Sequence, residues 1–253
     1  ELNEIHTARL ITELIPEGDC LFSSNSMPIR ELDMYGSPGK SPVTIGANRG
    51  ASGIDGIIAA AAGFCAGHNK RTTLLIGDLA FLYDLNSLAL LKGLPQPMVI
   101  VVLNNNGGGI FSFLPINNIK NGFEQYFGTP HHLTFSAAAD LFDLNYAQPQ
   151  TTEEFVKTYS VALKGRGPTI IEVIGDRKAN LEIHTSLQGE IKRKIDMHLN
   201  NKSGVESWRK KPLKPLLVCN RLSLCLIWRY YVASSITGGE ILQEDCMDSI
   251  SKR

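Results

Sequence analysis

The sequence has no excess of charge of either sign and no long apolar run. Its 253 residues include 25 lysines and arginines against 25 aspartates and glutamates, so its charge does not indicate nucleic acid or an anionic membrane surface as a partner. A membrane helix needs about twenty apolar residues. The longest candidate, residues 216–233, is interrupted by Asn220, Arg221 and Arg229. We therefore expect no nucleic-acid partner and no membrane span.

Cysteine is sparse, and its positions do not suit a metal site. The five cysteines form no CxxC pair and have no metal-ligand spacing to a histidine, which favours reduced thiols in an intracellular protein. The chain shows no signal or transit peptide, although it begins at Glu1 without an initiator methionine. Two phosphate-binding motifs are also absent, because residues 46–53 lack the GxGxxG spacing and no GxxxxGK(S/T) occurs.

The sequence does contain an alternation of strand and helix patterns. Continuous apolar runs typical of buried parallel strands are found at residues 20–23, 73–76, 98–103 and 169–174. Helical patterns are found at residues 54–66, 84–92, 136–142 and 152–163. This order predicts an α/β fold with an open, doubly wound, mostly parallel sheet flanked by helices, in which ligands bind outside the carboxyl ends of the strands.

The pattern changes after residue 174. Residues 181–199 are compatible with a basic helix, residues 200–204 break it, and the stretch from 208 to 215 has the composition of a linker. From residue 216 onward neither a period of 3.6 nor a period of 2 is present. We therefore expect one domain at residues 1–180, and at residues 181–253 a helix, a linker and an irregular, poorly ordered tail.

Polar residues follow two of the expected strands. Gly77-Asp78-Leu79 comes directly after one strand, and a run of three asparagines and three glycines, residues 104–109, comes after the next. Carboxylate, amide and backbone oxygens at neighbouring strand ends suit Mg²⁺, which usually keeps phosphate oxygens in its shell. The glycines allow a tight turn close to a phosphate. The layout predicts a Mg²⁺-diphosphate site.

Each of these residues also has a plainer interpretation. Asp78 could cap the helix that follows it, because Asp is a preferred N-cap residue. The asparagines could form a polar turn, because Asn tolerates left-handed backbone conformations. The combination of Asp78 with Asn105 and Gly107 favours the ligand interpretation, with Asn104 and Asn106 as supporting residues.

Together the motifs resemble a known enzyme family. The GDG-like start and the asparagine-rich end resemble the thiamine diphosphate (ThDP) motif. The flanking segments are similar to the MenD family, the 2-succinyl-5-enolpyruvyl-6-hydroxy-3-cyclohexene-1-carboxylate (SEPHCHC) synthases, including the MenD-like part of the plant PHYLLO proteins. These segments are residues 24–30, 48–56, 83–86 and 104–111. The resemblance extends from residue 1 to about residue 179 and implies the C-terminal, diphosphate-binding domain with its ThDP-binding fold.

The resemblance implies roles for individual residues. Asp78 and Asn105 would bind Mg²⁺ through their side chains and Gly107 through its backbone carbonyl. Ile54 would be the apolar wedge that bends ThDP into a V, although it could also be a core residue. The implied cofactor-binding residues are Ile54, Gly77, Asp78, Leu79, Asn105, Gly107, Ile110 and Phe111.

Arg30, Arg49 and Ser26 are the implied substrate-binding residues. The implied substrates, 2-oxoglutarate and isochorismate, are dianions, and the planar fork of arginine suits carboxylates. The alternative for a lone arginine is a surface salt bridge. Ile110 and Phe111 would pack on the isochorismate ring. The histidines match no catalytic position of the family, and His131 and His132 are expected to be solvated in a loop.

The implied activity is decarboxylation of 2-oxoglutarate, followed by conjugate addition of the resulting ThDP-bound carbanion to isochorismate, in menaquinone or phylloquinone biosynthesis. In this superfamily the glutamate that activates ThDP lies in a separate pyrimidine-binding domain of the same or a partner subunit. No such domain occurs in this sequence. We therefore expect this chain to supply only half of an active site and to be inactive on its own. We expect the complete protein to be a homo-oligomer.

Two alternatives to this activity remain open. The chain could belong to another ThDP-dependent class, such as acetolactate synthase or an oxo-acid decarboxylase. It could also be a cofactor-binding module or a truncated piece of a longer polypeptide without activity of its own. The expected location is the chloroplast for a plant protein and the cytoplasm otherwise.

Overall fold

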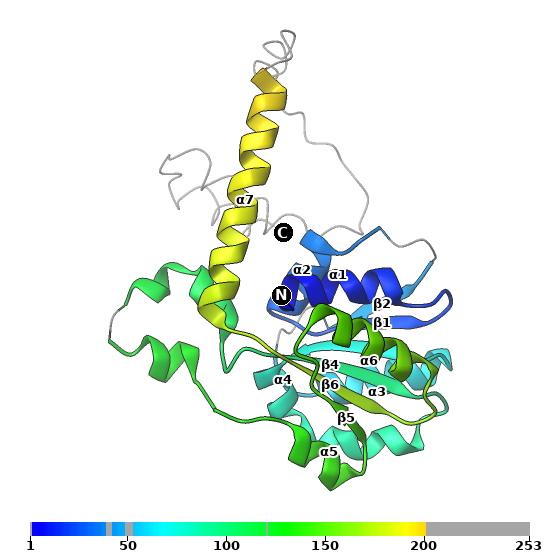
Figure 1. Cartoon of the computed structure of the whole chain (residues 1–253). Coiled ribbons are helices and arrows are strands. Elements are labelled where there is room, and N and C mark those ends of the chain that lie inside the picture. The colour runs from blue at the N-terminus through cyan, green and yellow to red at the C-terminus, as the bar shows by residue number, and fades with distance from the viewer. Residues whose placement is uncertain (1, 39–41, 49–52, 120, 201–253) are drawn as a thin grey trace, which may run out of the picture. The chain divides into compact units, whose positions relative to one another are not determined.

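The computed structural model describes residues 2–38, 42–48, 53–119 and 121–200. Residues Glu1–Lys194 belong to one compact unit, built on a six-stranded sheet in the order β2-β1-β3-β4-β6-β5 (Figure 1). Every pair of neighbouring strands is parallel. The strands are β1 (Cys20–Ser23), β2 (Thr44–Ala47), β3 (Thr72–Gly77), β4 (Met98–Asn104), β5 (Asn145–Ala147) and β6 (Thr169–Ile174).

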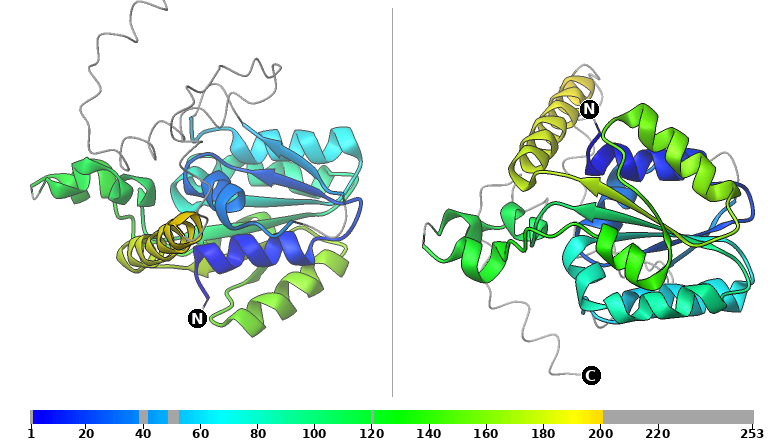
Figure 2. Two further views of the ribbon diagram at one scale, coloured as in Figure 1. Left: turned by 90° about the horizontal axis from the view of Figure 1, so that it is seen from above. Right: turned by 60° about the horizontal axis from the view of Figure 1, so that its bottom comes forward.

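Helices cover both faces of the sheet (Figure 2). The α-helices are α1 (Glu4–Leu14), α2 (Met27–Tyr35), α3 (Ile57–His68), α4 (Asp78–Tyr83), α5 (Ser136–Phe142), α6 (Thr152–Lys164) and α7 (Arg177–Asn200). The 3₁₀ segments are η1 (Leu85–Gly93), η2 (Gly109–Phe113) and η3 (Pro115–Asn118), and η4 (Glu124–Gly128) is a turn of π helix. The expected doubly wound α/β fold is confirmed.

Strand β4 contributes side chains to both hydrophobic cores, one on each face of the sheet. Alternate residues point to opposite faces of a strand, so a strand with helices on both sides is apolar throughout. Ile100 and Val102 enter the cluster under α3, α4, η1 and α5. Val101 and Leu103 enter the cluster under α1 and α6. This double burial explains the unbroken apolar run in the sequence.

Several elements differ from the sequence-based expectation. The helix expected at residues 84–92 is a 3₁₀ segment, η1, preceded by a separate short helix, α4. Helices α1 and α2 and the short edge strands β2 and β5 were not expected. Helix α7 begins at Arg177, so the expected domain boundary at residue 180 falls inside it and stays a prediction. The expectations for residues 201–253 lie outside the described residues.

None of the helices in the described part of the chain is both long enough and apolar enough to cross a bilayer.

Candidate functional site

The polar residues predicted from the sequence are gathered at one edge of the sheet by strand register. In β1 and β3, Ser23 pairs with Leu75, and in β3 and β4, Gly77 pairs with Leu103. These parallel strands therefore end side by side. The segments that follow them contain Ser26, Asp78 and Asn105, and ligands of doubly wound sheets bind at this edge.

Asp78 is buried and is held from both sides. Its Oδ1 accepts a hydrogen bond from the Leu79 N–H (2.6 Å), and its Oδ2 accepts one from the Gly107 N–H (2.9 Å). Asp78 is the first residue of α4, and the N-cap position itself is occupied by Gly77. Burial raises the pKa of Asp78, and the hydrogen bond from Gly107 opposes this rise.

Gly107 occupies a position that requires glycine. Its φ is 132°, and an added Cβ would overlap with the carbonyl oxygen of Gly128. A side chain there would meet both left-handed strain and a backbone clash. The same loop contact includes a hydrogen bond from the Gly108 N–H to the Gly128 carbonyl (2.7 Å). The glycine run therefore brings two backbone segments together beside Asp78.

Of the two polar atoms in the Asn105 side chain, one makes a hydrogen bond and the other has no partner among the described residues. Its Nδ2 donates to Glu4 Oε1 at 3.0 Å, whereas its Oδ1 is buried and accepts no hydrogen bond from any described residue. An orphaned buried oxygen is costly, and a cation is a partner that would satisfy it. Among the described residues no group of three or more His, Cys, Asp or Glu side chains could hold a metal ion. Oxygen donors from an Asp, an Asn and a backbone carbonyl suit Mg²⁺ better than a transition metal.

The expectation that His131 is solvated is wrong. Its side chain is only 8% exposed, and its Nε2 lies 3.1 Å from Asp78 Oδ2. Its Nδ1 accepts a hydrogen bond from the Leu133 N–H (3.0 Å), so Nε2 is the nitrogen that donates to Asp78. The sequence held no signal for this contact, because His131 lies 53 residues after Asp78, with strand β4 between them.

Asn104 and Asn106 make hydrogen bonds that hold the segments around Asn105, and their support of a metal site stays a prediction. Asn104 Nδ2 donates to Glu172 Oε1 (2.6 Å), and its Oδ1 accepts from the Asn106 N–H (3.2 Å). Asn106 has a positive φ of 62°. Its Oδ1 accepts from the N–H groups of His131 (3.0 Å) and His132 (2.7 Å), which fixes the loop that places His131.

A buried polar cluster lies behind Asn105, and sequence reasoning missed it. Glu4 and Glu31 are adjacent and almost wholly buried, and His184 Nε2 lies 3.5 Å from Glu31 Oε1. Burial raises the pKa of Glu4 well above its usual value, with the Glu31 charge adding to the rise. Burial also raises the pKa of Glu31 to about 7 and lowers that of His184. The sequence feature that could have indicated this cluster is Glu4, a charged residue on the apolar face of α1.

The expected substrate residues are only partly described. Ser26 has a positive φ of 70° and precedes α2, and Arg30 Nη1 donates to its carbonyl oxygen (2.5 Å). Arg49 lies outside the described residues. A positive φ at a serine is strained, and such strain is common at functional sites.

The expected apolar cofactor residues are partly buried. Ile54 packs against the core cluster below α3, so the core interpretation holds and the wedge role stays a prediction. Ile110 and Phe111 belong to η2, where the Phe111 ring meets that of Phe127 at 5.5 Å between centroids.

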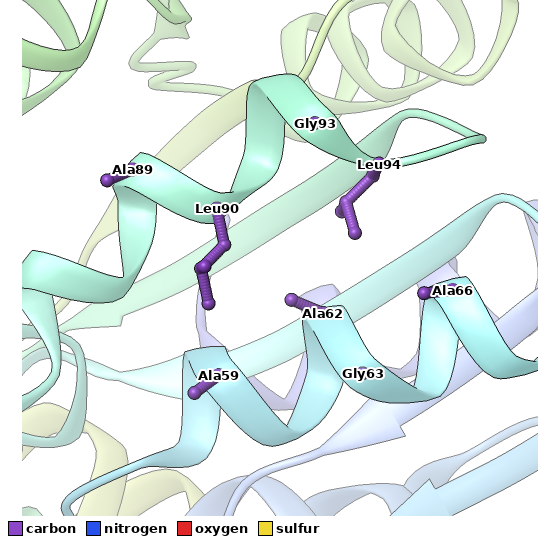
Figure 3. Close-up of a pocket in the computed structure, with 8 residues that line it drawn as sticks. All are labelled: Ala59, Ala62, Gly63, Ala66, Ala89, Leu90, Gly93 and Leu94. Carbon is purple, nitrogen blue, oxygen red and sulfur yellow. The ribbon is translucent and has the colours of Figure 1, made fainter.

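A shallow groove runs between α3 and η1 and contains no reactive group. Figure 3 shows that Leu90 and Leu94 point toward α3 across it. Its lining consists of small or aliphatic residues, namely Ala59, Ala62, Gly63, Ala66, Ala89, Leu90, Gly93 and Leu94. None of these is a predicted site residue.

Comparison with known proteins agrees with this site. Residues 40–173 match the family model of the thiamine pyrophosphate enzyme, C-terminal TPP binding domain. The chain belongs to this family. The match spans the Asp78 to Gly107 region and strands β2 to β5 with nearly all of β6, whereas β1 lies before it.

Curated relatives agree with the assignment to TPP enzymes. SEPHCHC synthases from Rubrobacter xylanophilus and Chlorobium phaeovibrioides are 53% and 49% identical to the chain, over 74% and 75% of its length. The matches cover 32% and 33% of those proteins, so the chain spans about a third of the curated relatives it matches. The resemblance to the MenD family is confirmed. Both relatives are bacterial, and neither supports the chloroplast expectation.

Benzoylformate decarboxylase from Polynucleobacter necessarius has a similar fold. The TM-score is 0.59 at 20% identity, over 70% of this chain and 33% of that one. At this identity the likeness concerns the fold alone.

Proposed function

We propose that this chain is the diphosphate-binding part of a ThDP-dependent SEPHCHC synthase. One observation carries the proposal: buried Asp78 and Asn105 lie beside glycine-dependent Gly107 at the carboxyl edge of the sheet, and Asn105 Oδ1 has no partner among the described residues. The identity of about 50% to SEPHCHC synthases supports the proposed activity over that of other ThDP enzymes.

In this proposal different residues bind the Mg²⁺-diphosphate end and the remainder of the cofactor. Asp78, Asn105 and the Gly107 carbonyl would hold Mg²⁺ and, through it, the diphosphate. Gly77, Leu79, Ile54, Ile110 and Phe111 would line the remainder of the cofactor site. When bound, ThDP supplies the chemistry for decarboxylating a 2-oxo acid, and the protein supplies position and electrostatics.

The proposed substrates are 2-oxoglutarate and isochorismate. Arg30 and Arg49 would each present a fork of N–H donors to a carboxylate, which is the geometry that arginine offers and lysine does not. Ser26, whose strained backbone lies at the sheet edge, would lie near the cofactor and the substrate. The Asp78 ligand would be steadied by His131 through the contact from Nε2.

The proposal also includes a partner domain. The pyrimidine-binding domain, from the same or a partner subunit, would close the site and supply the activating glutamate, in a homo-oligomer. The curated relatives are about three times as long as their match to this chain, which leaves room for such a domain. A chloroplast location would follow from a plant origin.

A chimaera tests the activity. In it this chain replaces the matching part of the Rubrobacter xylanophilus synthase, and product formation from 2-oxoglutarate and isochorismate is followed by mass spectrometry. We expect SEPHCHC to form, and pyruvate in place of 2-oxoglutarate to give much less product. A folded chimaera that binds ThDP but prefers another 2-oxo acid would assign the chain to a different class of ThDP enzyme. The unaltered Rubrobacter enzyme is the control.

A further inference from the structure

Glu4 occupies a position where an apolar residue is expected. It shares one face of α1 with Ala8 and Ile11, both wholly buried, and is itself only 2% exposed. Glutamate is almost never fully buried unless it is paired. Burial of Glu4 therefore costs stability unless hydrogen bonds to its carboxyl group offset the lost hydration.

The contact of Glu4 with Asn105 orients the amide. Only the Nδ2 end of an asparagine amide donates hydrogen bonds, and Nδ2 donates to Glu4 Oε1 at 3.0 Å. With Nδ2 engaged, Oδ1 is the acceptor that remains, and it is buried without a partner in the described part of the chain. The amide therefore has one end fixed by α1 and the other available to a ligand.

We propose that Glu4 is a positioning residue of the metal site, holding Nδ2 of Asn105 so that Oδ1 is presented to the ion. This inference rests on the proposed role of Asn105 as a Mg²⁺ ligand. Outer-shell partners of metal ligands commonly fix ligand orientation, and their loss typically weakens metal binding about 10- to 100-fold. Helix α1, distant in sequence from the ligands, thereby becomes part of the cofactor site.

A purely structural role for Glu4 is the competing explanation, because Glu4 also lies against Glu31. Two variants separate the roles. Glu4→Gln keeps an oxygen that can accept from Asn105, whereas Glu4→Met keeps the length of the side chain and removes the acceptor. Tyr159→Phe is the control for general destabilisation, because it breaks a buried hydrogen bond to Thr73 (2.8 Å) that involves none of the proposed ligands.

The first measurement needs no cofactor. In the 253-residue chain, the side-chain amide protons of Asn105 are followed by ¹⁵N nuclear magnetic resonance and solvent exchange. We expect slow exchange in the wild type, Glu4→Gln and Tyr159→Phe, and at least about tenfold faster exchange in Glu4→Met, because a hydrogen-bonded amide is protected from solvent. Equal exchange in the wild type and Glu4→Met would overturn the inference.

The second measurement determines the Mg²⁺ concentration that gives half-maximal ThDP binding to the chimaera. Glu4→Met should raise it about tenfold or more, and Glu4→Gln should restore most of the affinity. In an Asn105→Ala background, Glu4→Met should add no further change, because Glu4 acts through Asn105. An unchanged Mg²⁺ requirement in Glu4→Met would contradict the inference alone. ThDP binding by the unmodified chimaera that needs no divalent ion would contradict the proposed function.

Discussion

Gly107 is the residue whose conformation most constrains the site. Its φ of 132° and the overlap of any added Cβ with the Gly128 oxygen leave no space for a side chain. We expect Gly107→Ala to lower the free energy of unfolding by about 2 kcal/mol or more, as measured by urea denaturation. Gly63→Ala is the matched control: it lies inside α3 with open space around its Cβ and should raise stability by up to about 1 kcal/mol. Equal effects of the two substitutions would contradict this account of the loop.

Arg30 offers a test of substrate binding at the same scale. We expect Arg30→Ala to lower kcat/KM of the chimaera by about ten- to a hundredfold, because a charge-assisted contact to a carboxylate is lost. Arg30→Lys should recover only part of this activity, because an ammonium group cannot reproduce the fork. ThDP affinity, titrated in parallel, should change less than kcat/KM. Unchanged kinetics in Arg30→Ala would return this arginine to a structural role at the start of α2.

At the scale of single elements, the start of α6 is fixed by a capping residue that the sequence reveals. Thr151 Oγ1 accepts from the Glu154 N–H (3.1 Å), and Glu154 Oε2 accepts from the Gln150 N–H (2.7 Å). We expect Thr151→Ala to lower the thermal midpoint, corresponding to a loss of about 1 kcal/mol. Thr151→Ser keeps the capping oxygen and should remain close to the wild type. A loss of equal size in the serine variant would show that the cap is not the cause.

Elements with such local signals were predictable from the sequence. The buried strands β1, β4 and β6 and the helices α5 and α6 lie where the apolar runs and the cap placed them, within a residue at each end. Edge strands β2 and β5 lack a continuous apolar run because they are only partly buried. Their pairing depends on neighbouring strands rather than on their own pattern.

The candidate site likewise contains residues that could be predicted from the sequence and residues that could not. Asp78, Asn105 and Gly107 directly follow predictable strands, so parallel register alone brings them to one edge. Glu4 lies on helix α1 and His131 lies between η4 and α5, and only the tertiary structure brings them to Asn105 and Asp78. Single-sequence patterns hold no information on such contacts, because they depend on how distant segments pack.

At the scale of the whole molecule, burial of Glu31 makes stability depend on pH. Its pKa is raised from 4.5 to about 7 by burial, so its neutral form is favoured in the folded state. The neutral Glu31 carboxyl group therefore contributes to the free energy of unfolding at low pH. This contribution is fully present below about pH 4.5 and is lost as the pH rises through about 7, by roughly 3 kcal/mol at most. Urea denaturation between pH 4.5 and 8 should show this decline. In Glu31→Gln, which cannot ionise, the decline should be smaller, and identical pH profiles would contradict the assignment.

The most direct test of the central claim, that Asp78, Asn105 and Gly107 hold Mg²⁺ and the diphosphate of ThDP, is a calorimetric titration of the chimaera with ThDP in the presence of Mg²⁺. Asp78→Ala removes the only charged ligand of the proposed set. The account predicts that this variant keeps the circular dichroism spectrum of the wild type and binds ThDP at least about tenfold more weakly. Unchanged ThDP affinity in a folded Asp78→Ala chimaera would contradict the account and leave Asp78 as a structural residue at the start of α4.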